Sequence, residues 1–154
     1  MLKILIFRTD RIGDLIVTCP SIISLKNYSH KTEVTLVTSS KNYEYAKSLN
    51  FIDHVIKFPK NSIIDKIKFF YALSKKEFNF IFVFDGKERS ILTASLIKSK
   101  IKVALASSIK IYYKFFKIKF FTDIECTNLN VIFQKMINYS GLKIKIDNYD
   151  FIKK

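Results

Sequence analysis

The sequence predicts an α/β fold, a Rossmann-like and doubly wound parallel sheet. Short runs of apolar, β-branched and aromatic residues alternate along the 154-residue chain with segments whose apolar residues recur at helical spacing. One run, residues 78–84, is almost continuously apolar, as expected of a strand covered on both faces. Strands that alternate with helices form parallel sheets. The length suits one domain with its own core, so we expect residues 1–154 to form a single domain.

The first half of the chain contains three expected strands and three expected helices. Residues 2–7 form an apolar run, residues 32–38 alternate, and residues 52–58 repeat the strand pattern before Pro59 ends it. Between these strands, apolar residues at helical spacing predict a first helix, and residues 41–49 predict a short second one. Ser62 can cap a third helix. The first helix carries Leu15, Ile16, Ile22, Ile23 and Leu25, and the third carries Ile63, Ile64, Ile67, Phe70 and Leu73.

The second half continues the alternation. After the strand 78–84, residues 90–97 are expected to be helical, residues 101–106 to form a strand, and residues 128–139 to form a last helix closed by Gly141. The other two glycines also fall at expected turns, Gly13 before the first helix and Gly86 after the central strand. In doubly wound sheets ligands bind at the carboxyl ends of the strands. The loops 8–14 and 85–90 should therefore lie on one rim.

Composition constrains partners and location only loosely. The net charge of +14 favours anionic partners, although solvated lysines in a biased composition explain part of it. No apolar run is long enough to span a bilayer, and residues 2–7 are too short for a signal peptide, so we expect a cytoplasmic protein with peripheral contact to the membrane. Cys19 and Cys126 lack metal-ligand spacing and are expected to be reduced, Cys19 in the core. No metal or cofactor site is predicted.

Residues 8–14 place two arginines and two aspartates directly after the first strand. Gly13 permits a tight turn or the approach of a ligand, and Asp14 falls in the first helical turn, where the helix dipole favours its charge. Thr18 shares the helix face of Asp14. The alternative is structural: Asp14 caps the helix, while the arginines pair with the aspartates. The charged members of this loop are Arg8, Asp10, Arg11 and Asp14.

The second candidate loop follows the central strand. Asp85 ends the strand, and Lys87, Arg89 and Ser90 begin the next helix, where their donors and the positive end of the helix dipole suit an anionic group. An exposed and solvated helix start is the alternative. Together the two loops form the predicted binding surface.

These segments resemble the heptosyltransferases, also called glycosyltransferase family 9. The resemblance begins with the strand 2–7 and the run Arg8-Thr9-Asp10-Arg11-Ile12-Gly13-Asp14, and continues through Thr18, Pro20 and residues 25–26. It extends to residues 35–38, 50–56 and 84–90, and so covers nearly the whole chain. One departure is the segment 123–128, which lacks a histidine common in the family.

The resemblance implies one half of a two-domain glycosyltransferase-B architecture. In that family the N-terminal half receives the acceptor, and the C-terminal half, which is absent here, binds a nucleotide sugar, typically ADP-heptose. Asp14 matches the proposed general base, which takes a proton from the acceptor hydroxyl during inverting transfer. Arg8 and Arg11 are expected to hold phosphates or carboxylates of a lipopolysaccharide-core acceptor, Gly13 to leave room for the sugar, and the chain to be inactive without a donor domain. Asp10, Thr18, Asp85, Lys87, Arg89 and Ser90 complete the expected substrate-binding residues.

Two other functions remain as alternatives. The chain could be a non-catalytic module that binds an anionic glycan or lipid headgroup. A basic nucleic-acid binder is a weaker hypothesis, and we expect no nucleic-acid partner. Residues 110–121 mix lysines with aromatic residues, which suits an anionic membrane or single-stranded nucleic acid, with Lys110, Lys114 and Lys117 on one helical face. Packing against the core, with the lysines outward, is the favoured interpretation of this segment.

Overall fold

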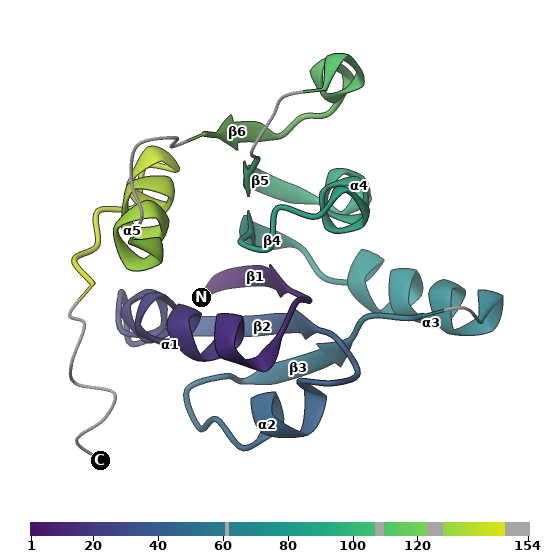
Figure 1. Ribbon diagram of the computed structural model, residues 1–154, viewed down its shortest axis with the longest axis horizontal. Helices are drawn as coiled ribbons and strands as arrows, with labels where there is room; N and C mark the ends of the chain where they lie inside the picture. Colours follow the sequence, from purple (N-terminus) through teal and green to yellow (C-terminus); the bar gives the residue numbers. More distant parts are fainter. Residues whose placement is uncertain (61, 107–109, 123–127, 147–154) are drawn as a thin grey trace.

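The computed structural model describes residues 1–60, 62–106, 110–122 and 128–146. Its six strands form one parallel sheet in the order β3-β2-β1-β4-β5-β6 (Figure 1). This confirms the predicted doubly wound α/β fold. The strands are β1 (Leu2–Arg8), β2 (Thr32–Thr38), β3 (His54–Lys57), β4 (Phe78–Val83), β5 (Ser99–Leu105) and β6 (Lys119–Phe121).

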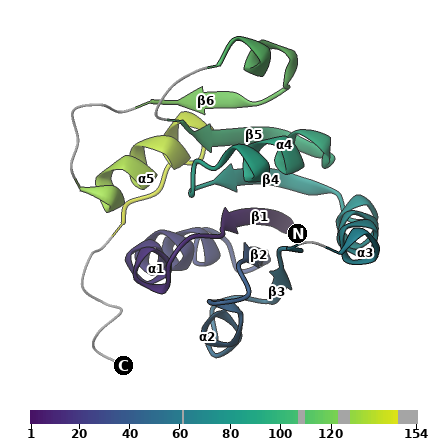
Figure 2. The same ribbon diagram turned by 45° about the vertical axis from the view of Figure 1, so that its right-hand side comes forward.

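Helices cover both faces of the sheet. In Figure 1, α1 and α5 lie on one side of the strands and α3 and α4 on the other, and Figure 2 shows the same separation from a second direction. The α-helices are α1 (Ile12–Lys26), α2 (Tyr43–Lys47), α3 (Ile63–Ser74), α4 (Glu88–Leu96) and α5 (Leu129–Tyr139). A short 3₁₀ helix, η1 (Ile111–Phe115), precedes β6.

Successive side chains of each strand pack alternately into two hydrophobic cores, one on each face of the sheet. Ile4 and Ile6 of β1 face α1 and α5, whereas Leu5 and Phe7 face α3 and α4, and all four are fully buried. The period of two in the strands places neighbouring residues on opposite faces of the sheet. The sheet is therefore fixed from both sides, and the loops at its carboxyl ends are held on a rigid base.

The predicted Ser62 cap and two of the three predicted turns are present, and Asn128 adds a cap that was not predicted. The Ser62 hydroxyl accepts the Asp65 N–H at 3.2 Å, and the Asn128 side chain accepts the Asn130 N–H at 3.0 Å. Gly86 and Gly141 have positive φ angles of 59° and 98°. Gly13 differs from the expectation of a tight turn because it lies within α1 and has no positive φ.

The segment 110–121 corrects one prediction and confirms another. It forms η1 and β6 in place of the helical lysine face, and β6 was not predicted because three residues carry little strand signal. Tyr113 and Ile118 are buried in the core beneath α3 and α4, which confirms the favoured packing interpretation for these two residues, whereas Ile111 and Phe115 are 79% and 87% exposed. Lys110 lies at the surface, 2.8 Å from the Glu88 carboxylate.

Cys19 is a buried core residue, as predicted. Its Sγ donates to the Leu15 carbonyl at 3.3 Å, and burial raises the pKa of the Cys19 thiol to about 12. Cys126 lies outside the described residues. Within the ranges described, none of the helices combines the length and apolar character needed to cross a membrane.

Candidate functional site at the topological switch point

The two loops predicted to share a rim meet between β1 and β4. The strand order reverses at this pair, since β1 connects toward β2 on one side and β4 toward β5 on the other. Such a switch point opens a crevice at the carboxyl ends of the strands. The Phe84 N–H donates to the Phe7 carbonyl at 3.0 Å, so the residues that follow both strands begin side by side.

Asp85 fastens the second loop to the first. Its Oδ2 accepts the Thr9 N–H at 3.0 Å, the Thr9 hydroxyl at 2.6 Å and the Ser90 hydroxyl at 2.8 Å. Its Oδ1 accepts the Lys87 N–H at 3.0 Å. With four donors around it, the carboxylate is occupied within the protein, and Ser90 is fully buried. This geometry favours a structural role for Asp85 and Ser90, both of which the sequence suggested as substrate contacts.

Thr9 is a central residue of the site that the sequence analysis did not single out. Its carbonyl accepts Lys87 Nζ at 3.2 Å and lies 3.5 Å from Arg89 Nη2, which also donates to the Thr9 hydroxyl at 3.2 Å. Thr9 is neutral and lies among two arginines and two aspartates, so its residue type alone did not indicate a role in the site. Its position directly after a buried strand was the only available clue.

Arg8 is buried, with only 4% of its side chain exposed. Its Nη1 donates to the Phe84 carbonyl at 2.8 Å and lies 3.1 Å from Asp10 Oδ2, while Nε donates to the Asp14 carbonyl at 3.1 Å. The ring of Phe133 from α5 covers the guanidinium, 5.3 Å from its centroid. Arg8 therefore holds the rim together, and this geometry favours positioning over direct acceptor binding.

Burial shifts both members of the Arg8–Asp10 pair against their charged forms. It lowers the pKa of Arg8, against the effects of the surrounding aspartates, and it raises the pKa of Asp10, although the Arg8 cation acts in the opposite direction. Within the described part of the chain, the buried Asp10 Oδ1 has no hydrogen-bond partner. The Asp10 carbonyl accepts the Asn42 side-chain amide at 2.9 Å, which ties this loop to α2.

Asp14 has a freer side chain than Asp10, with 40% exposed. Its Oδ2 accepts the Arg11 N–H at 3.2 Å, and its Oδ1 lies 4.0 Å from Arg8 Nη2. The carboxylate thus caps the start of α1, as the structural alternative predicted, and remains half-exposed at the mouth of the switch point. Both features are compatible with a base that is held in one orientation and can be reached from solvent.

The other predicted residues of α1 differ in their access to a ligand. Thr18 is fully buried, and its hydroxyl donates to the Asp14 carbonyl at 2.7 Å, so its position favours a structural role. Gly13 is exposed, and a Cβ built there would meet nothing within 4 Å. Arg11 is exposed at the start of the helix. The open surface beside Asp14 is therefore formed by Gly13 and Arg11.

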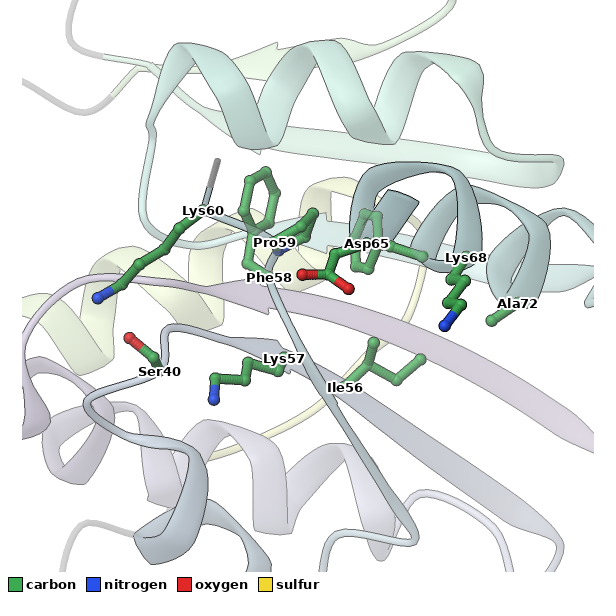
Figure 3. A pocket seen from close by; sticks show the side chains of 10 residues that line it. Ser40, Ile56, Lys57, Phe58, Pro59, Lys60, Asp65, Lys68 and Ala72 are labelled. Atoms are coloured by element: carbon green, nitrogen blue, oxygen red, sulfur yellow. The ribbon is translucent and has the colours of Figure 1, made fainter. Parts of the chain in front are cut away.

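A cavity of about 670 Å³ lies beside these loops, at the carboxyl end of β3 and the start of α3 (Figure 3). Lys57, Lys60 and Lys68 line it together with Asp65, and Phe58 and Phe69 supply apolar walls. In Figure 3, Lys57 and Lys60 point toward the end near Ser40, and Lys68 lies toward Ala72. Three ammonium groups against one carboxylate make this cavity suited to an anionic group. Asp14 is not among its lining residues.

Arg89 connects this cavity to the switch point. Its guanidinium lies over the Phe58 ring, 5.1 Å from the centroid, while its Nη2 donates to the Thr9 hydroxyl. The hydroxyl of Ser39, next to the lining residue Ser40, is 3.4 Å from the Asp10 carbonyl. Lys57 and Lys60 were missed from the sequence because lysines are abundant, although Lys57 lies near the end of a predicted strand and Lys60 just beyond it.

No group of three or more metal-ligating side chains is present among the described residues. Nor do the described glycines form a phosphate-binding cradle, because Gly13 lies within α1 and Gly86 follows β4. What the rim offers is a half-exposed carboxylate, surrounding cations and an adjoining basic cavity.

The fold matches solved glycosyltransferase structures. The E. coli heptosyltransferase WaaC with ADP superposes with a TM-score of 0.72 at 15% identity, over 90% of this chain and 47% of that chain. The chain shares its fold with the heptosyltransferases. A glycosyltransferase of family 9 from Veillonella parvula DSM 2008 gives a TM-score of 0.74 at 16% identity, over 95% and 44% of the two chains. E. coli WaaC with ADP-2-deoxy-2-fluoro heptose gives 0.71 at 16% identity, over 96% and 52%.

The heptosyltransferase likeness confirms the predicted Rossmann-like fold, which matches structures of the glycosyltransferase-B architecture. The chain spans about half the length of these heptosyltransferase and family 9 structures. No protein-family model matches the sequence, and comparison with curated proteins finds no match. The likeness to the heptosyltransferases therefore concerns the fold.

Proposed function

We propose that this chain is the acceptor-binding half of an inverting glycosyltransferase. Its donor is a nucleotide sugar of the ADP-heptose type, and its acceptor is a lipopolysaccharide-core or related anionic glycan. The observation that carries this proposal is the half-exposed Asp14 carboxylate at the switch point, which accepts the Arg11 N–H and lies next to the open surface at Gly13. The shared fold with two heptosyltransferase structures supports the same class of reaction.

In the proposed reaction, an acceptor hydroxyl lies against Asp14. Its oxygen forms a bond to the anomeric carbon of the donor sugar as the bond from that carbon to the phosphate oxygen breaks on the opposite face. The proton passes to the Asp14 carboxylate, and the electron pair of the broken bond leaves with the nucleoside diphosphate. A positioned carboxylate base contributes about 10²- to 10⁴-fold to such a step.

The acceptor's anionic groups are assigned to the exposed cations and to the basic cavity. Arg11 and Arg89 are exposed on the rim, half-buried Lys87 lies beside them, and Lys57, Lys60 and Lys68 line the adjoining cavity. Buried Arg8 instead keeps Asp10 and Asp14 in place. The acceptor would thus extend from Asp14 toward β3, and a second domain would bring the donor to the same rim.

The test combines binding with turnover. We expect a lipopolysaccharide inner-core oligosaccharide to bind the chain in calorimetry, and Lys57→Gln/Lys60→Gln to weaken that binding at least tenfold. With a donor-binding domain supplied on a second chain, Asp14→Asn should reduce sugar transfer at least a hundredfold with acceptor affinity unchanged. Lys143→Gln, at an exposed lysine after α5, serves as the control. Undiminished transfer by Asp14→Asn would remove Asp14 from the mechanism.

A non-catalytic module for anionic glycans or lipid headgroups is the second candidate. The bond from the Arg11 N–H to Asp14 favours it, because a helix cap gives the carboxylate a purely structural use. In that case the cavity lysines would still control binding. A complete lack of transfer with every donor-domain partner, combined with intact oligosaccharide binding, would select this candidate.

A further inference from the structure

Helix α3 carries a second row of apolar residues on its solvent-facing side, opposite the side that packs on the sheet. Only Phe69 and Leu73 of this helix are buried against the sheet. Ile63, Ile67 and Tyr71 follow one another at four-residue spacing on the outward side, with 73%, 63% and 60% of each exposed, and Ile64 lies beside them. A solvent-facing helix surface normally carries polar residues. This stripe therefore needs a separate explanation.

The stripe continues onto the end of α4. A groove of about 440 Å³ runs between the two helices. Its apolar lining residues are Ile63, Ile67, Phe70, Tyr71, Leu96 and Ile97, and Lys66 and Ser74 complete the lining. Leu96 is 74% exposed. In Figures 1 and 2, α3 forms the outer margin of its layer, and no described element lies outside it. The result is a continuous apolar surface, which we call the α3–α4 surface: the stripe residues of α3 together with Leu96.

Lysines border this surface. Helical geometry places Lys66 on one edge of the α3 stripe and Lys68 and Lys75 on the other, and Lys75 Nζ lies 4.1 Å from the centroid of the Tyr71 ring. The segment from Ser62 to Lys76 holds four lysines and one acidic residue, Asp65. An apolar stripe with cationic edges is the pattern of a helix that lies in the surface of an anionic bilayer, where lysine stems extend toward the headgroups.

We propose that the α3–α4 surface binds anionic lipid bilayers, with α3 parallel to the membrane plane. Charge complementarity selects this partner over a second copy of the chain. Pairing two copies through this surface would bring their lysine borders together in a protein whose net charge is already +14. A bilayer with negative headgroups instead accepts the isoleucines and neutralises the lysines. The proposal places the membrane contact on α3, outside the segment 110–121.

The experiment is co-sedimentation of the full chain with lipid vesicles. We expect binding to mixed vesicles of phosphatidylcholine and phosphatidylglycerol, weak binding to phosphatidylcholine alone, and weaker binding as salt is raised. Ile64→Ser/Ile67→Ser should lower the apparent association constant about tenfold or more. Lys66→Gln/Lys75→Gln should lower it about fivefold for each lysine removed.

Matched controls lie on the opposite layer. Val131→Ser on α5 and Lys143→Gln/Lys145→Gln alter exposed apolar and basic residues there and should leave vesicle binding unchanged. All substituted positions are exposed, so thermal melts should match the parent chain. The proposal is overturned if the parent ignores the mixed vesicles, or if the α3 and control variants bind alike. Sedimentation velocity adds a third test: self-association that Ile64→Ser/Ile67→Ser abolishes, with vesicle binding unchanged, would identify an interface between copies.

Discussion

The Asp85 carboxylate accepts both the backbone N–H and the hydroxyl of Thr9, at 3.0 and 2.6 Å, and so joins the loops that follow β1 and β4. Because Ser90 and the Lys87 N–H donate to the same group, Asp85→Ala would leave several donors without their acceptor. We expect a loss of about 1–3 kcal/mol in the free energy of unfolding, measured by urea denaturation. Glu77→Gln, in a pair that is 80% exposed on both sides, should change it by less than about 0.5 kcal/mol.

Replacement of Arg8 should mainly lower the stability of the fold, because its guanidinium is engaged in contacts within the protein. Arg8→Ala leaves the partly buried Asp10 without its cation and removes two donors to backbone carbonyls, so we expect a loss of about 3 kcal/mol. Arg8→Lys keeps the charge but cannot reproduce the guanidinium geometry, and should also destabilise the chain. Thermal melts of both variants, compared with Arg11→Ala at the exposed neighbouring arginine, test this. Melts of Arg8→Ala that match the parent would contradict the structural role.

Gly13 and Gly86 should respond oppositely to alanine. Gly13 lies in a helix with open space around it, so Gly13→Ala should stabilise the fold by up to about 1 kcal/mol. At Gly86 the positive φ and the Leu105 carbonyl oxygen, 3.1 Å from an added Cβ, make Gly86→Ala destabilising. Urea denaturation of both variants measures the difference. A stable Gly13→Ala chain that binds the core oligosaccharide more weakly would indicate that the acceptor approaches this position.

The Lys26–Asp53 pair should make stability depend on pH in the acidic range. Burial acts to raise the pKa of Asp53, but hydrogen bonds from Lys26 Nζ and the Val34 N–H outweigh it, so the pKa lies below its ordinary value of 3.8. Because the folded pKa is lowered, the contribution is fully present above that ordinary value and is lost as the pH falls through the folded value. After allowance for solvent screening, we expect about 1 kcal/mol.

Asp53→Asn tests the sign of this effect. The variant should be less stable than the parent near neutral pH, and the difference should shrink as the pH is lowered below 3.8. Urea midpoints measured across that range provide the comparison. A difference that grows toward acid pH would contradict the assignment.

Cys19 should be inert to thiol reagents while the protein is folded. Its thiol is buried and its pKa is raised to about 12, so little thiolate is present near neutral pH. In a Cys126→Ser background, we expect labelling by a disulfide reagent only after addition of denaturant. Rapid labelling of the native chain would show that the α1 core opens readily.

Much of the fold could be predicted from the sequence because it depends on local periodicity. Ser62 and Gly141 mark helix ends through local interactions, and the structure has them where they were expected. The short strand β6 was not predicted, because its pairing with β5 depends on residues elsewhere in the chain. Local patterns thus identify elements that are long enough to repeat.

The sequence predicted where the candidate residues lie, but not which of them would be occupied by contacts within the protein. Charge and position in the sequence placed Asp14, Asp85 and Arg89 at the carboxyl ends of β1 and β4, where the structure has them. The sequence did not show that Phe133 would cover Arg8, or that Thr9 would receive the donors of the second loop, because these contacts join distant segments. The cavity lysines were indistinguishable from the many others in the chain.

The bond between Thr9 and Asp85 spans 76 positions of the sequence. During synthesis, β1, α1 and β2 leave the ribosome well before β4, so the first loop emerges without the carboxylate that fixes it. The Arg8 guanidinium acquires its covering ring later still, because Phe133 belongs to α5, the last helix. The rim can therefore acquire its final shape only after the last helix has been made.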